Sequence, residues 1–182
     1  MTGRTAIYNA RLLDPASGLD TNGGILIENG LITDIGPTIT KTTAADVKID
    51  AKGKALAPGL IDLRVKTGEP GAENKETLET AGDAAAAGGV TTFIVMPDTD
   101  PVLDEPGLVE MLKFRARSLN LSHLYPLGAL TRSLKGEALT EMAELTEAGC
   151  VGFAQAEAVC RDTLVLHRAL QYASTFGYTV WL

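Results

Sequence analysis

The sequence predicts an α/β fold in which a small antiparallel β unit precedes a series of strand–helix units. In residues 5–50, short β-rich runs alternate with turn signals, whereas after Lys54 strand-like runs alternate with helical patterns. Strands that alternate with amphipathic helices form parallel β-α-β units. We therefore expect two parts, a β portion at residues 1–55 and a strand–helix part at residues 56–182.

The turns of the N-terminal part define its strands. Apolar runs at residues 24–28 and 31–35 are separated by Asn29-Gly30, and Asp14-Pro15-Ala16-Ser17-Gly18 marks an earlier turn. Both central residues of a type I′ turn take positive φ, which Asn and Gly tolerate best. We therefore expect a hairpin at Asn29-Gly30.

The second part contains four strand–helix units and the opening strand of a fifth. The strands are expected at residues 57–65, 90–96, 121–130, 150–154 and 178–182, and the helices at 75–87, 105–118, 137–148 and 161–176. Gly88-Gly89 ends the first helix. A closed (β/α)₈ barrel has eight strands and about 250 residues. The count fits either an open doubly wound sheet or the first part of a barrel whose remaining half lies outside this chain.

Composition excludes several classes of function. The 182 residues are 45% hydrophobic and 5% aromatic, and 16 Lys+Arg against 23 Asp+Glu leave a formal net charge of −7. This balance disfavours nucleic-acid binding. We expect a cytoplasmic protein that does not bind membranes, because the sequence shows neither a signal peptide nor an apolar run of membrane-spanning length.

Cys150 and Cys160 lack the spacing of a metal or redox motif, and we expect both to be reduced and buried.

Charged residues alternate with apolar ones along the strand expected at residues 57–65. Side chains alternate between the faces of a strand, which places Asp62, Arg64 and Lys66 on the face opposite Ile61, Leu63 and Val65. In a parallel barrel the carboxyl ends of the strands form the site. Taken alone, the pattern fits a solvated strand end, or an Asp62–Arg64 pair that neutralises itself, better than a functional site.

Several motifs resemble the cyclic amidohydrolases, and the dihydroorotases among them most closely. They are Pro58-Gly59-Leu60-Ile61-Asp62-Leu63, Glu69-Pro70-Gly71, Gly89-Val90-Thr91-Thr92, Met96-Pro97-Asp98-Thr99-Asp100-Pro101 and Tyr125-Pro126-Leu127-Gly128-Ala129-Leu130-Thr131. The likeness extends from near residue 5 to residue 182. It implies the first half of a (β/α)₈ amidohydrolase barrel, preceded by a small β-sandwich portion.

The resemblance also shows where this sequence departs from the family. The two metal-binding histidines of the first barrel strand fall on Arg64 and Lys66. A guanidinium has no lone pair to offer a metal, and an ammonium beside a divalent ion adds repulsion. We therefore expect no metal and no cofactor at these two positions.

Further family positions are substituted as well. The substrate-binding arginine falls on Gly68, the substrate-contacting asparagine falls on Asp98, and the acidic turn after the fourth strand falls on residues 155–156, where no carboxylate precedes Glu157. His123 and His167 are expected to be structural. The resemblance thus implies no catalytic residue among the visible site positions.

Three functional hypotheses follow from the resemblance. The first is a catalytically inactive dihydroorotase-like protein of pyrimidine biosynthesis, a homo-oligomer that acts as a structural partner of aspartate transcarbamoylase. The second is an active zinc-dependent hydrolase that converts dihydroorotate to N-carbamoyl-aspartate with ligands outside this chain. The third is a fragment without independent function.

The first hypothesis assigns a role to the charged residues of the altered site. Arg64 and Lys66 substitute for the metal's charge, balanced by Asp98 or by the pairing candidates Asp62 and Glu69. A buried cation pair needs such partners. We also expect an anion to bind near Arg64 and Lys66.

Overall fold

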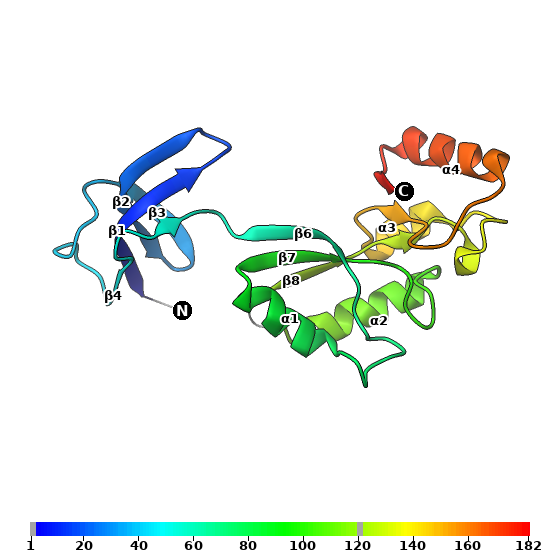
Figure 1. Cartoon of the computed structure of the whole chain (residues 1–182), viewed down its shortest axis with the longest axis horizontal. Helices are drawn as coiled ribbons and strands as arrows, with labels where there is room; N and C mark the ends of the chain where they lie inside the picture. The colour runs from blue at the N-terminus through cyan, green and yellow to red at the C-terminus, as the bar shows by residue number, and fades with distance from the viewer. Residues whose placement is uncertain (1–2, 120–121) are drawn as a thin grey trace. The chain divides into compact units, whose positions relative to one another are not determined.

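The computed structural model describes residues 3–119 and 122–182. The chain forms two compact units, Met1–Pro58 and Gly59–Leu182, which we call the N-terminal unit and the strand–helix unit (Figure 1). The sequence placed this boundary between residues 55 and 56. Among the described residues, no helix combines the length and the apolar character needed to cross a membrane.

The N-terminal unit is one five-stranded sheet. Its strands are β1 (Arg4–Asp14), β2 (Leu19–Glu28), β3 (Leu31–Gly36), β4 (Val47–Asp50) and β5 (Ala55–Leu56). β2 lies antiparallel between β1 and β3, but β4 and β5 pair with β1 in parallel. The expectation of a purely antiparallel unit is therefore wrong, because the chain returns along the other edge of β1 after β3.

The hairpin expected at Asn29-Gly30 is confirmed. The two residues separate β2 from β3, and their φ angles of 52° and 81° are both positive, as a type I′ turn requires. Before this turn, Ile25 and Leu26 of β2 are buried in clusters with the β1 residues Leu12 and Ala6, respectively. The turn chemistry and the buried pattern of β2 therefore agree on the register of the sheet.

The strand–helix unit alternates strands and helices as expected. Its elements are β6 (Leu60–Val65), α1 (Leu78–Ala87), β7 (Val90–Val95), α2 (Pro106–Ala116), β8 (His123–Pro126), β9 (Gly128–Ala129), the 3₁₀ helix η1 (Arg132–Leu134), α3 (Met142–Ala148), β10 (Phe153–Ala154), α4 (Thr163–Phe176) and β11 (Val180–Trp181). Two three-stranded sheets, in the orders β6-β7-β8 and β9-β10-β11, are parallel throughout.

The strand expected at residues 121–130 is split into β8 and β9 at Leu127, and Leu121 lies outside the described residues. The peptide N–H of Leu127 donates to Val95 at 2.9 Å, and that of Gly128 donates to Gly152 at 2.9 Å. Hydrogen bonding thus changes from the β7 side to the β10 side at this point. The two sheets meet along one continuous run of chain.

Helix ends follow local capping chemistry. Thr77 forms a capping box at the start of α1, and Asp162 accepts hydrogen bonds from the first turn of α4. Gly149 and Gly177 end α3 and α4 in the left-handed conformation. All four helices begin later than expected, whereas α1, α3 and α4 end at the expected residues 87, 148 and 176.

The expected glutamate-rich helix at residues 137–148 is wrong in its first part. α3 begins only at Met142, and Thr131 pairs with Leu139 in an isolated antiparallel bridge. Glu137 therefore lies outside the helix and is exposed. The bridge uses the backbone groups that a longer helix would need.

The main core lies between the sheets and helices α1 to α4. Phe93 and Phe153 extend from β7 and β10 and are almost fully buried with Leu112 of α2 and Leu145 of α3. Burying a large apolar side chain stabilises the fold by about 1.5–3 kcal/mol. This layer fixes the register of the strands and therefore the positions of their carboxyl ends.

A buried amide ties the segment after β9 to the end of β10. Gln155, 3% exposed, accepts a hydrogen bond from the Thr131 hydroxyl at 2.9 Å and donates to the Leu134 carbonyl at 2.8 Å. Thr131 in turn accepts from the Gly136 peptide N–H at 2.9 Å. Both ends of the amide are therefore satisfied, as burial demands.

We predict that Gln155→Leu destabilises the protein by about 1–3 kcal/mol, because it leaves the Leu134 carbonyl without its amide donor and the buried Thr131 hydroxyl without its acceptor. Urea titration of the full-length protein measures the loss. Gln171→Leu, an exposed position on α4, is the matched control and changes the free energy of unfolding by less than about 0.5 kcal/mol. Equal effects of the two variants contradict the prediction.

The two cysteines differ in their surroundings. Cys150 is buried as expected, but Cys160 is partly exposed, so the expectation that both are buried is wrong for Cys160. Cys160 lies in the segment between β10 and α4, where the side chain is not enclosed by the helix layer. Burial raises the pKa of the Cys150 thiol to about 12.

This difference predicts selective alkylation by iodoacetamide. At pH 9, a thiol with a pKa of about 12 is ionised in roughly one molecule per thousand, so Cys150 reacts only after unfolding. Native protein should therefore be labelled at Cys160 alone, as peptide mass spectrometry would show, and both cysteines should react in denaturant. Native labelling that persists undiminished in Cys160→Ser would refute this assignment.

Candidate functional site

Four charged side chains gather at the carboxyl ends of neighbouring strands. Arg64 lies near the end of β6, Lys66 directly follows β6, Asp98 follows β7, and Glu157 follows β10. Carboxyl ends of parallel strands meet at the same edge of a sheet, where (β/α)₈ enzymes place their sites. We call Arg64, Lys66, Asp98 and Glu157 the charged cluster.

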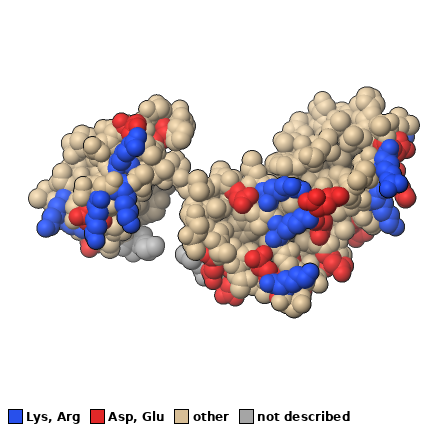
Figure 2. Space-filling model, viewed as in Figure 1, with Lys and Arg blue, Asp and Glu red and all other residues tan. Residues whose placement is uncertain are grey.

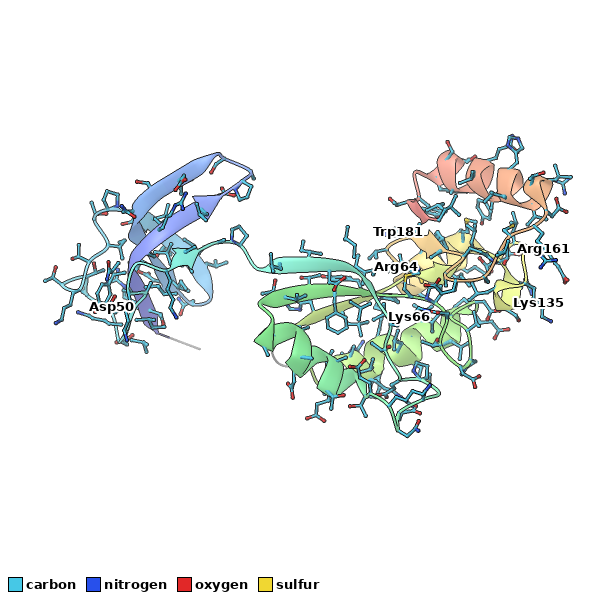
Figure 3. The ribbon with its side chains drawn as sticks, viewed as in Figure 1. Asp50, Arg64, Lys66, Lys135, Arg161 and Trp181 are labelled. Carbon is cyan, nitrogen blue, oxygen red and sulfur yellow. The ribbon has the colours of Figure 1, made fainter. Side chains whose placement is uncertain are left out.

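Ion pairs join the members of the charged cluster. Arg64 Nη2 lies 2.6 Å from Glu157 Oε1, and Lys66 Nζ lies 2.7 Å from Asp98 Oδ2 and 3.6 Å from Glu157 Oε1. Figure 3 shows Arg64 and Lys66 together at this end of β6. The structure thus brings the sequence-predicted Arg64, Lys66 and Asp98 together, and adds Glu157 as the shared carboxylate.

Solvent weakens each pair individually. The Arg64 and Glu157 side chains are 56% and 64% exposed, and Lys66 is 50% exposed. Exposed pairs of this kind contribute about 0–1 kcal/mol each. The hydrogen bond to Asp98 raises the pKa of Lys66, so its ammonium stays protonated at neutral pH. On the face drawn in Figure 2, basic and acidic side chains of the strand–helix unit lie next to one another.

Asp62 does not take part as expected. Its carboxylate accepts a hydrogen bond from the Arg64 peptide N–H at 3.0 Å, while the guanidinium reaches Glu157. Asp62 is in register with Phe93 and Val65 with Val95, so β6 uses one more residue than β7 over this step. This irregularity breaks the strict alternation on which the expected shared face of Asp62 and Arg64 depended.

The apolar face expected for this strand is also only partly covered. Ile61 and Leu63 are 61% and 53% exposed, and Val65 alone of the three packs against the main core. Of these three apolar residues, the described part of the chain therefore covers Val65 but leaves Ile61 and Leu63 largely exposed.

Glu69 has a structural role away from the charged cluster. Its carboxylate accepts a hydrogen bond from Arg115 Nη1 at 2.8 Å and another from the Leu78 peptide N–H at 2.9 Å. It therefore links the loop after β6 to α1 and α2. Among the ion pairs of the described residues, Glu69 pairs with Arg115 and not with Arg64 or Lys66.

Position 68 leaves no space for a long side chain. A Cβ atom on Gly68 would lie 2.5 Å from the carbonyl oxygens of Ala72 and Glu76, which are backbone atoms. Contacts this short require the backbone to shift. The position that the resemblance assigns to a substrate-binding arginine is thus packed against the chain itself.

Apolar side chains form a second layer on the sheet face opposite the helices. Ile94, Met96, Leu127 and Ala154 are buried together, and Trp181 packs against them. Ile94 and Met96 alternate with Phe93 and Val95, which face the helices. This layer was not predicted, although the alternation of apolar residues at 93–96 and the apolar ends of the later strands indicate it.

The charged cluster does not fit a divalent metal. Arg64 has no lone pair to donate, and protonated Lys66 is already paired with Asp98. Gln155 uses both ends of its amide within the fold. In the described residues 3–119 and 122–182, no three side chains of His, Cys, Asp or Glu are grouped as a metal site would require.

The two histidines lie elsewhere. His123 begins β8, at the strand end opposite the charged cluster, and is exposed. His167 is exposed on α4. The structure therefore places neither histidine with Arg64 and Lys66.

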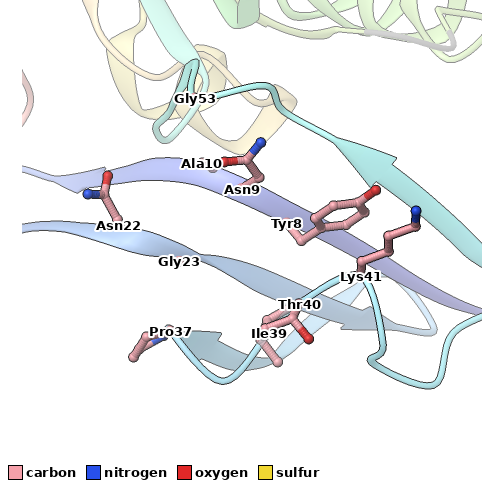
Figure 4. Close-up of a pocket in the computed structure, with 10 residues that line it drawn as sticks. All are labelled: Tyr8, Asn9, Ala10, Asn22, Gly23, Pro37, Ile39, Thr40, Lys41 and Gly53. Carbon is pink, nitrogen blue, oxygen red and sulfur yellow. The ribbon is translucent and has the colours of Figure 1, made fainter.

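A separate hollow lies within the N-terminal unit. It has a volume of about 320 Å³ and is lined by Tyr8, Asn9, Ala10, Asn22, Gly23, Pro37, Ile39, Thr40, Lys41 and Gly53 (Figure 4). Asn9 is held by a 2.8 Å hydrogen bond from its side chain to Asp50. The hollow contains none of the residues that the sequence assigned to a site.

Sequence similarity to known proteins identifies the family of this chain. Residues 53–178 match the family model described as dihydro-orotase-like. The chain is 41% identical over 167 residues to a dihydroorotase of Pelobacter propionicus and 43% identical over 175 residues to a dihydroorotase-like protein of Pseudomonas aeruginosa. These alignments cover 92% and 96% of this chain but 39% and 41% of the relatives, so the chain spans about two fifths of their length.

Solved structures support the fold. An L-hydantoinase from Arthrobacter aurescens superposes with a TM-score of 0.81 at 24% identity, covering 97% of this chain and 39% of the hydantoinase. A dihydroorotase crystal structure superposes with a TM-score of 0.67 at 12% identity, covering 97% of this chain and 50% of that one. The expected first part of an amidohydrolase α/β fold is confirmed, and the chain belongs to the dihydroorotase-like family of amidohydrolases.

Proposed function

We propose that this protein is a catalytically inactive dihydroorotase-like member of pyrimidine biosynthesis that acts as a structural partner of aspartate transcarbamoylase. The observation that carries the proposal is the pairing of Arg64 and Lys66 with Glu157 and Asp98. These cations stand where the resemblance assigns metal-binding histidines. Their charges are balanced by protein carboxylates, so the cluster is neutral without a metal.

The surroundings of the cluster support the same proposal. Metal-dependent hydrolysis needs ligands with lone pairs, held in a fixed geometry, and a position for the activated water. Here Gly68 excludes a side chain and Gln155 is committed to hydrogen bonds within the fold. The apolar layer that includes Met96 and Trp181 lines the adjacent sheet face.

The second candidate is an active metal-dependent hydrolase of cyclic amides. It is favoured by the identity of about 40% to relatives named dihydroorotase. Such an enzyme would hold zinc on ligands outside this chain. The two candidates differ in metal content and in turnover, and both can be measured on the full-length protein.

We predict that the full-length protein binds zinc substoichiometrically and hydrolyses dihydroorotate no faster than buffer, because the cations at positions 64 and 66 repel a divalent ion. Elemental analysis and a dihydroorotate hydrolysis assay test this, before and after zinc is added. The Pelobacter propionicus relative, assayed in parallel, controls for the conditions. One zinc per chain together with turnover abolished by chelator contradicts inactivity.

We predict that the full-length protein co-purifies with aspartate transcarbamoylase of the same organism, and that loss of the protein lowers that enzyme's activity severalfold. Size-exclusion chromatography of the co-expressed pair and assays with and without the partner test this. A chelator should leave the complex intact, because the proposed role is structural. Separate elution, with transcarbamoylase activity unchanged without the protein, rules out the partnership.

A further inference from the structure

Glu157 acts as an anion held between two cations. A single atom, Oε1, lies 2.6 Å from Arg64 Nη2 and 3.6 Å from Lys66 Nζ. Lys66 keeps its shorter pair, 2.7 Å, with Asp98. Glu157 is therefore the only member of the charged cluster whose carboxylate faces both cations.

The carboxylate of Glu157 can leave this position without disturbing the fold. Glu157 lies in a turn after β10 that is closed by the Ala158 peptide N–H donating to Gln155 at 3.1 Å. Gln155 anchors the turn from inside the protein. The Glu157 side chain is 64% exposed, so a rotation about its own bonds releases it into water.

Departure of Glu157 would leave an excess of positive charge. The cluster holds two cations and two carboxylates, and only Asp98, at 23% exposure, is well enclosed. Without Glu157, the guanidinium of Arg64 presents a planar pair of donors that matches a carboxylate or phosphate. Lys66 adds a second charge from two residues further along the chain.

We propose that Arg64 and Lys66 form a binding site for a small carboxylate or phosphate anion, which Glu157 occupies as an internal ligand and which an external anion takes by displacing it. The site differs from the family's hydrolytic one, since its donors are the two cations themselves. The anion site extends the proposed function, because it assigns a ligand to Arg64 and Lys66 at the end of β6. It rests on the proposed absence of a metal between these side chains.

Removing the internal ligand tests the proposal. Calorimetric titration of the full-length protein at low ionic strength uses inorganic phosphate in one arm and malonate in the other. We expect weak binding to the wild type and roughly fivefold tighter binding to Glu157→Gln, the effect of deleting a competing exposed ion pair. The arm with the larger enhancement identifies the preferred anion. Arg64→Gln, added to Glu157→Gln, should abolish saturable binding.

Matched controls separate the proposal from a general charge effect. Glu28→Gln also removes the carboxylate partner of an arginine, the 2.6 Å pair with Arg4, and should leave the anion affinity unchanged. Circular dichroism verifies that each variant is folded, and Glu157→Ala provides a second variant that also lacks the carboxylate. Equal affinity in wild type, Glu157→Gln and Glu157→Ala overturns the proposal, as does saturable binding that survives Arg64→Gln in the Glu157→Gln background. These failures leave the zinc and hydrolysis results untouched, so failure of the anion site can be distinguished from failure of the proposed function.

Discussion

The hydrogen bonds on either side of Leu127 hold the strand–helix unit together. One peptide N–H points to β7 and the next to β10, so the same run of chain belongs to both parallel sheets. Leu127 itself is fully buried between the apolar side chains of β7 and β10. Parallel pairing on both sides directs every strand the same way, and the carboxyl ends of β6, β7 and β10 therefore meet.

The chemistry of the strand ends depends on which face each residue occupies. Phe93 and Val95 point to the helices, while Ile94 and Met96 point to the opposite face. The apolar layer of Ile94, Met96, Leu127 and Ala154 is buried, whereas the charged cluster stays largely exposed at the strand ends. This division explains why four charged groups can sit beside a buried apolar layer without losing contact with water.

Local signals in the sequence determined much of the fold. Asn29, Gly30 and Gly89 take positive φ angles that few other residues accept, and the turn and the helix end that they mark were predicted correctly. The start of α3 was predicted too early, because Thr131 and Leu139 form a backbone bridge. Helix periodicity carries no information about such a pairing. The partly exposed position of Cys160 depends likewise on how the segment before α4 packs.

The candidate site was predictable in part for a similar reason. Arg64, Lys66 and Asp98 could be identified because each lies at a strand end marked by a motif. Glu157 could not be assigned as their partner, because it is 93 positions from Arg64 and meets it only through the parallel order of the strands. The displacement of Asp62 from the shared face reflects an irregular register, which strand alternation by itself does not reveal.

The sharing of one carboxylate by two exposed cations has a consequence for how such a site can change over evolutionary time. Each exposed ion pair adds little stability, so a substitution at any one of these positions changes the free energy of unfolding only slightly. A metal site at these positions would be different, because a single histidine at position 64 would still face the ammonium of Lys66. The charged cluster can therefore change one residue at a time, whereas a metal site at positions 64 and 66 would require both cations to be replaced together.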